Sequence, residues 1–221
     1  NIIDLSATYL CIYFAGLVFV FIYNVGAGIL RAVGDSRRPL YFLILCCFIN
    51  IVLDIILIVF LKMGVAGAAI ATTFSQGISA VMVTVTLCRT TDIFRLRVKK
   101  IRFHAQPMGM IVKIGLPAGL QSVMYSLSNV IIQSSLNTFG TETVAAWTAF
   151  SKIDAIYWMI SGAFGIAITT FVGQNYGAGK FGRMKKSVRV CLAMDIGASI
   201  LISAVLFFLG GYVFQLFTGD A

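Results

Sequence analysis

Residues 39–61 read PLYFLILCCFINIVLDIILIVFL, a stretch whose side chains are apolar or aromatic except for Asn50 and Asp54. An α-helix rises about 1.5 Å per residue, so about 20 apolar residues cross the ~30 Å hydrocarbon core of a bilayer. The stretch is long enough for one crossing. It therefore predicts a membrane-spanning helix.

Five further apolar stretches flank this one. Of the 221 residues, 59% are hydrophobic and 11% are charged, whereas a soluble domain carries about 25% charged residues. This composition excludes a soluble globular protein. The six predicted helices span residues 5–31, 39–61, 65–88, 109–138, 143–172 and 187–217. We therefore expect an all-α, polytopic membrane protein with six transmembrane helices.

The positions of the basic residues predict the orientation. Apart from Lys62 and Lys152, the 17 Lys and Arg residues lie between the ends of the first, third and fifth predicted helices and the first turns of the helices that follow. Short cytoplasmic loops collect Lys and Arg, so we expect these loops in the cytoplasm and both chain ends outside, in a multi-pass protein of the plasma or inner membrane. The net charge of +9 then reflects topology, and we expect membrane lipids, but no nucleic acid, as partners.

The longest polar connector separates three predicted helices from three others. It predicts two transmembrane halves, residues 1–91 and 109–221, joined by a basic cytoplasmic connector at 92–108. The connector is either a solvated linker attracted to anionic headgroups, at about 1 kcal/mol per basic residue, or a regulatory or partner-binding segment. Because the chain begins with Asn1 and stops just after a helix, we expect an internal piece of a longer protein.

Catalytic and metal-binding patterns are missing from the sequence. The five cysteines show no CxxC spacing and His104 is the only histidine, which argues against a disulfide framework or a transition-metal site. HExxH, GxSxG and Walker A motifs do not occur. We expect no enzyme and no cofactor. Without a nucleotide-binding domain, active transport would draw on an ion gradient.

Acidic residues within apolar helices are functional candidates, because each costs roughly 2.5–3.5 kcal/mol at a helix centre. Asp54 follows Asn50 by four residues, so both side chains lie on one helix face and can share a cation, a proton or a water. The alternative is a carboxyl that Asn50 and a neighbouring hydroxyl satisfy and that serves packing only. Asp154 is expected at the membrane interface, and Asp195 is expected to pair with the basic cluster ending at Arg189 or to snorkel.

The fourth predicted helix carries a polar stripe. At 100° per residue, its members fall within an arc of about 60°. They are Ser122, Ser126, Asn129 and Gln133. The stripe faces a water-filled, substrate-accessible cavity, or it forms hydrogen bonds to a neighbouring helix.

Two further features concern helix packing. Pro117 lies inside the fourth predicted helix, which predicts a kink or a freed carbonyl there. The run GVAGAAIAT at residues 64–72 consists mostly of small side chains, which predicts a close approach between helices.

Six short motifs follow one another along the chain. They are GILRAVGDSRRP at 28–39, NIVLD at 50–54, GVAGAAIAT at 64–72, IGLP at 114–117, NTFG at 137–140 and FVGQNYGAGK at 171–180. In this order they resemble the multidrug and toxic compound extrusion (MATE) family over almost the whole chain. Twelve helices form two six-helix lobes in that family. This chain resembles helices four to nine: the second half of the N-terminal lobe, the connector, and the first half of the C-terminal lobe.

The resemblance implies a secondary antiporter that exports organic, often cationic drugs and toxins in exchange for Na⁺ or H⁺. Family members bind the coupling cation between an acid on their first helix, which lies outside this sequence, and polar residues on the fifth and sixth helices. Asn50 and Asp54 match the fifth-helix pair and Thr72 matches the sixth-helix threonine, so Na⁺ is one expected occupant at Asp54. We expect a monomer. Our hypothesis is that neutralisation of Asp54 rearranges the first lobe and ejects the drug.

Two other interpretations remain open. One is a flippase for a lipid-linked saccharide or precursor of the same superfamily, which is expected to line its cavity with cationic residues. Lys62 and Lys152, near the outer ends of their helices, are the only basic residues away from the predicted cytoplasmic loops. The membrane acid and the neutral stripe therefore favour a cationic substrate. The other interpretation is a non-transporting membrane fragment.

Overall fold

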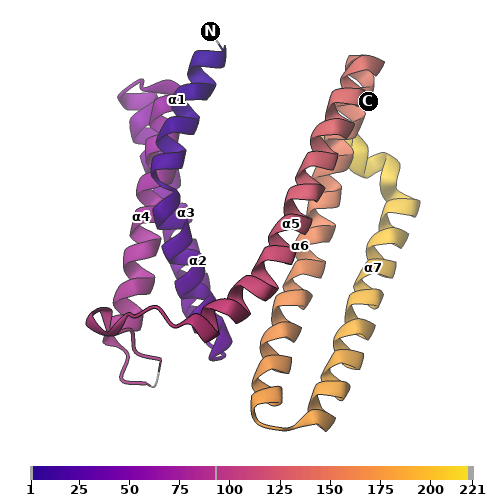
Figure 1. The fold of residues 1–221 in the computed structure, drawn as a ribbon. Coiled ribbons are helices and arrows are strands. Elements are labelled where there is room, and N and C mark those ends of the chain that lie inside the picture. The colour runs from indigo at the N-terminus through magenta and orange to yellow at the C-terminus, as the bar shows by residue number, and fades with distance from the viewer. Residues whose placement is uncertain (1, 93, 219–221) are drawn as a thin grey trace. The chain divides into compact units, whose positions relative to one another are not determined.

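A computed structural model of the chain describes residues 2–92 and 94–218, and these residues are almost entirely helical (Figure 1). The described α-helices are α1 Ile2–Ala15, α2 Leu17–Ala32, α3 Arg37–Asp54, α4 Gly64–Arg89, α5 Ala105–Leu136, α6 Thr141–Gly177 and α7 Phe181–Thr218. Shorter helical turns occupy Ile55–Phe60, Val98–Lys100 and Asn137–Phe139. No strand occurs among the described residues, which confirms the predicted all-α fold.

The membrane spans agree in number with the prediction. Within the described residues, five helices are long and apolar enough to cross a membrane, and α1 with α2 makes a sixth span when the two are counted together. The sequence predicted one continuous helix over residues 5–31. That detail is wrong, because α1 and α2 are bent by 46° at the break between them.

The bend at Gly16 has a cause in the neighbouring helix. The Gly16 N–H donates to the carbonyl oxygens of both Ile12, at 3.2 Å, and Tyr13, at 3.0 Å. The Thr73 hydroxyl of α4 also donates to the Ile12 carbonyl, at 3.5 Å. A Cβ atom at Gly16 would overlap the Thr73 side chain. A side chain therefore enters the hydrogen-bond ladder at the one residue that leaves room for it, which is a recognised cause of helix kinks.

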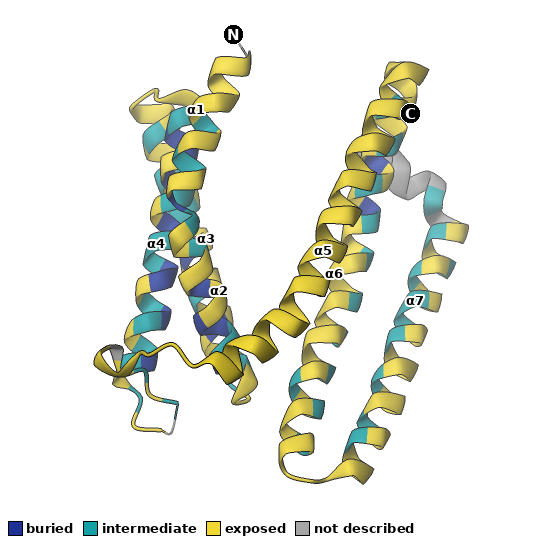
Figure 2. Cartoon of the chain, viewed as in Figure 1, coloured by how far each residue is buried: buried dark blue, intermediate teal, exposed yellow. Residues whose placement is uncertain are grey.

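The described residues divide into two compact units, one ending at Lys100 and the other beginning at Ile101. In the first unit α4 packs against α1, α2 and α3. Its buried cluster consists of Tyr23, Ala27, Leu30, Val83 and Leu87. Figure 2 shows the buried positions concentrated along α4 and the side of α2 that faces it.

Small residues of α4 allow this close packing. Gly67, Ala69 and Ala71 are buried. A Cβ atom at Gly67 would lie only 3.1 Å from the Cβ atom of Leu57, in the turn that follows α3. The close approach predicted for the 64–72 run is confirmed.

The connector begins by folding back onto the first unit. The Leu96 N–H donates to the Leu87 carbonyl at 2.9 Å, and the Arg95 Nε donates to the Cys88 carbonyl at 3.0 Å. Phe94 and Leu96 pack against the buried cluster of this unit. Carbonyls at the end of α4 that have no helical donor are thereby satisfied. The interpretation of the whole connector as a solvated linker is therefore wrong for Phe94 to Leu96, which pack against the first unit.

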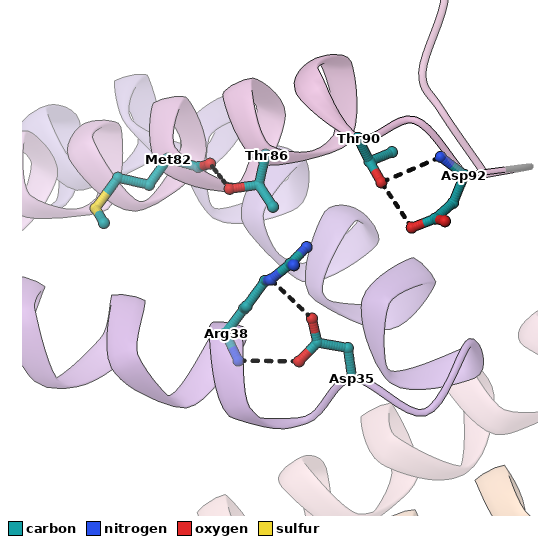
Figure 3. Close-up of polar contacts among 6 residues, drawn as sticks. All are labelled: Asp35, Arg38, Met82, Thr86, Thr90 and Asp92. Atoms are coloured by element: carbon teal, nitrogen blue, oxygen red, sulfur yellow. Dashed lines mark hydrogen bonds and ion pairs between the residues drawn. The ribbon is translucent and has the colours of Figure 1, made fainter.

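Polar contacts close the turns at the same end of the first unit (Figure 3). The Asp35 carboxylate accepts from the Arg38 backbone N–H and forms an ion pair with Arg38 Nε, each at 3.2 Å. The Thr90 hydroxyl donates to the Asp92 carboxylate at 2.9 Å. These groups are exposed, so they position the turns and contribute little free energy.

The second unit contains α5, α6 and α7. The last two helices form an antiparallel hairpin joined by a short turn after Gly177 (Figure 1). Helix α5 contacts α6 through Tyr125 and Trp158, whose ring centroids are 6.3 Å apart. Helix α5 continues as one helix through Pro117, whose missing N–H frees the carbonyl of Lys113.

A prediction concerns the one buried tyrosine of the cluster. The Tyr23 hydroxyl donates to the Pro39 carbonyl at 3.1 Å, and the residue is 6% exposed. Tyr23→Phe in the full-length protein is expected to lower the free energy of unfolding by about 1 kcal/mol, because the hydrogen bond is lost and the ring packing is kept. Tyr41→Phe is the control, since Tyr41 is 63% exposed. Denaturant titration in detergent measures both, and equal stability of the two variants would contradict the assignment.

Candidate functional site

Asn50 and Asp54 lie one helical turn apart at the end of α3. Asp54 is the last residue of the α-helix, and the turn Ile55–Phe60 that follows is a π-helix. Its wider geometry shows in the bond from the Leu61 N–H to the Ile56 carbonyl, at 3.0 Å, which spans five residues. Single π-helical turns within α-helices often occur at functional sites. The two polar side chains therefore lie where the helix changes its geometry.

Both side chains carry a buried polar atom without a partner. Among the described residues, Asn50 Nδ2 and Asp54 Oδ1 are the buried side-chain atoms that make no hydrogen bond. Buried polar groups are almost always paired, and a buried carboxylate oxygen without a partner is costly. Because the Asn50 Nδ2 makes no hydrogen bond, this atom does not fix which way the amide points, and a rotation would present its oxygen instead. The pair can therefore accept a proton or offer oxygen ligands to a cation.

Thr72 lies on α4, which packs against α3. Its hydroxyl donates to the Ala68 carbonyl at 2.9 Å and is partly buried. It makes no bond to the unpartnered atoms of Asn50 or Asp54. The structure thus places Asn50 and Asp54 on one helix and Thr72 on the helix packed against it, without a direct hydrogen bond. Carboxylate, amide and hydroxyl oxygens suit a hard cation or a proton.

The polar stripe of α5 lies on an exposed helix. All four of its members, Ser122, Ser126, Asn129 and Gln133, are exposed, and Figure 2 shows α5 exposed along nearly all of its length. Two of them make hydrogen bonds to residues four positions away in the sequence. The Ser122 hydroxyl donates to the Ala118 carbonyl at 3.1 Å, and Gln133 Nε2 donates to the Asn137 side chain at 3.3 Å. The role of the stripe, as cavity lining or as helix contact, stays a prediction.

Asp195 does not pair with the basic cluster ending at Arg189 in the described part of the chain, and its position at the membrane interface stays a prediction. Its Oδ2 atom accepts a hydrogen bond from the Ser161 hydroxyl of α6 at 3.3 Å. No ion pair of Asp195 occurs in the described part of the chain. Arg189 precedes Asp195 by six residues, which places the two about 120° apart around the helix. This angular separation was the signal that argued against pairing with the basic cluster.

A groove of ≈ 670 Å³ runs between α6 and α7, and Asp195 lines it. Two more contacts join these helices. The Cys191 thiol lies 3.7 Å from the Phe164 carbonyl, and the Ser199 hydroxyl donates to the Tyr157 hydroxyl at 3.5 Å. The groove is therefore part of a helix pair held by several polar contacts. No local sequence pattern predicted this groove.

Comparison with known proteins adds independent observations. A family model described as MatE matches residues 1–56 and 117–221. The probable multidrug resistance protein YpnP of Bacillus subtilis is 31% identical to this chain over 100% of its residues, which cover 49% of that protein. The multidrug export protein MepA of Staphylococcus aureus is 25% identical over 98% of the chain and 48% of that protein.

Solved structures agree with the sequence relatives. A crystal structure of MATE in the bent conformation superposes with a TM-score of 0.88 at 26% identity, over 97% of this chain and 48% of that one. The chain therefore spans about half the length of the proteins that it matches.

Proposed function

Because this chain belongs to the multidrug and toxic compound extrusion (MATE) family, we propose that it forms part of a secondary antiporter that exports organic cations in exchange for Na⁺ or H⁺. The family membership confirms the resemblance stated from the sequence motifs. MATE transporters are multi-pass membrane proteins, in agreement with the apolar helices described above. Membership also indicates transport rather than enzymatic catalysis.

The unpartnered carboxylate oxygen of Asp54 carries the proposal of ion coupling. It is buried, lies in an apolar helix and has no hydrogen-bond donor among the described residues. A carboxylate in such surroundings is stabilised when a proton or a cation neutralises its charge. Occupancy by H⁺ or Na⁺ therefore changes the charge at the end of α3. We assign Asn50 and Thr72 as the polar neighbours that complete this coupling site together with residues outside the chain.

The remaining assignments belong to the same proposal. Residues 1–91 belong to the N-terminal lobe, residues 109–221 to the C-terminal lobe, and 92–108 to the connector. The basic loops lie in the cytoplasm, and the transporter acts as a monomer in the plasma or inner membrane. The stripe of α5 contributes to the substrate cavity. Differential affinity for drug and ion in two conformations then drives export.

The test is efflux from proteoliposomes that contain the full-length protein. Ethidium serves as the fluorescent organic cation, and Na⁺ and H⁺ gradients are imposed separately. We expect one of the gradients to drive export, and an ionophore that dissipates this gradient to stop it. Efflux equal to that of protein-free liposomes under both gradients, with folded protein, would contradict the antiporter and favour a flippase or an inactive fragment.

A further inference from the structure

The groove between α6 and α7 combines a charged end with apolar walls. Its volume of ≈ 670 Å³ lies within the ~300–1,000 Å³ usual for small-molecule sites. Apolar side chains such as Ile168, Val172 and Leu192 form most of its lining, and Phe164 and Tyr176 add aromatic faces. Such a surface accommodates the apolar body of an amphipathic molecule.

Asp195 gives the groove a negative charge. It is the one charged residue among those that line the groove in the described structure. Ser161 engages its Oδ2 atom, and no Lys or Arg neutralises it within the described residues. An acid in a membrane helix that lacks a basic partner marks an ion or substrate pathway by default. Charge complementarity therefore selects a cation as the occupant.

The size and polarity of the groove distinguish an organic cation from a metal ion. A hard metal cation requires several oxygen ligands, whereas the Ser161 hydroxyl is the one side chain bonded to Asp195 among the described residues. The hydroxyl of Thr169, also in the lining, donates to the Gly165 carbonyl at 2.7 Å. Aromatic faces and apolar walls favour a cation that carries a hydrophobic body.

We propose that the groove between α6 and α7 is a binding site for amphipathic organic monocations, in which the Asp195 carboxylate balances the charge and the apolar walls hold the body. Ser161 orients the carboxylate. The site is separate from the coupling site, which lies in the other unit of the chain. The occupant follows from the charge and the volume of the groove, and its part in export rests on the proposed function.

Cys191 provides a local reporter, because its side chain lines the groove and is partly exposed. The full-length protein is treated with a trimethylammonium methanethiosulfonate reagent, and the modification of each cysteine is followed by peptide mass spectrometry. Tetraphenylphosphonium is the probe ligand. We expect it to slow the modification of Cys191 and to leave that of Cys88 unchanged, since Cys88 is also partly exposed but lies in α4.

Asp195→Asn tests the role of the charge. It is expected to raise the half-protecting concentration of tetraphenylphosphonium about tenfold, because a charge-balanced contact is lost. Asp154→Asn is the matched control, a partly buried acid on α6 that does not line the groove. Triphenylphosphine oxide, a neutral analogue, requires no variant and is expected to protect Cys191 at least about tenfold more weakly than the cation.

Four results would overturn the proposal. Cys191 does not react at all in the full-length protein, which means that another part of the protein covers the groove. The cation fails to protect Cys191, or the neutral analogue protects it equally well. Asp195→Asn leaves protection unchanged. The labelling needs no ion gradient, so protection without driven efflux contradicts the antiporter alone, and efflux without protection contradicts the groove site alone.

Discussion

Asp54→Asn is expected to reduce gradient-driven efflux to the rate of protein-free liposomes while the transporter still folds. The amide has nearly the size of the carboxyl but is neutral at every pH, so proton or Na⁺ occupancy no longer changes the charge at the end of α3. Because the substitution removes a buried carboxylate whose Oδ1 atom has no partner, stability is expected to stay equal or to rise by about 1–3 kcal/mol. Efflux of ethidium and thermal unfolding in detergent measure the two effects.

The matched control for Asp54→Asn is Asp154→Asn. Asp154 is also a partly buried acid in a helix long enough to span the membrane. Its substitution is expected to leave gradient-driven efflux close to that of the unsubstituted protein. Undiminished efflux by a well-folded Asp54→Asn protein would remove Asp54 from the coupling mechanism.

Gly26→Ala is expected to destabilise the first unit by about 1–3 kcal/mol, the usual cost of overpacking a well-packed core. A Cβ atom at Gly26 would lie 2.7 Å and 2.9 Å from the two methyl carbons of Val83. Val83 is fully buried, and its β-branched side chain has little freedom to turn away. Helices α2 and α4 would have to separate. The midpoint of unfolding in a denaturant titration measures the effect.

Gly28→Ala is the control for this substitution, in the same helix and two residues away. A Cβ atom there meets no other heavy atom within 4 Å, so Ala is expected to stabilise by about 0.5–1 kcal/mol through its higher helix propensity. Val83→Ala combined with Gly26→Ala is expected to recover part of the loss, because it removes the clashing methyl groups. Equal destabilisation by the two glycine variants would contradict the assignment of the effect to contact with Val83.

Local sequence was sufficient to predict the number of membrane spans and the position of Asn50 and Asp54 on one face of a helix. Apolar length sets the number of crossings, and a spacing of four residues puts both side chains on one face of a helix. Helices α6 and α7 were predicted too short, because α6 continues through uncharged polar residues up to Gly177 and α7 begins at Phe181, within a basic stretch. Lys and Arg are good helix formers, so a polar stretch does not end a helix by itself.

The features that the sequence did not reveal depend on distant residues. The bend at Gly16 requires Thr73, which lies on α4. The environment of Asp195 requires Ser161, 34 residues away on the facing helix. The π-helical turn after Asp54 lies within a run of Ile, Leu, Val and Phe residues, which is equally compatible with an α-helix. Tertiary packing, rather than local preference, decides these three details.

The π-helical turn beside Asp54 also has a mechanical consequence. Each hydrogen-bonded ring of this turn holds one residue more than an α-helical ring. The chain therefore contains one residue more than an α-helix would need, directly after the buried Asp54. Conversion of this turn to α geometry would advance the far end of the helix by about 1.5 Å and rotate it by about 100°. A change of charge at Asp54 would therefore act next to a turn at which the helix can translate and rotate while it keeps its backbone hydrogen bonds.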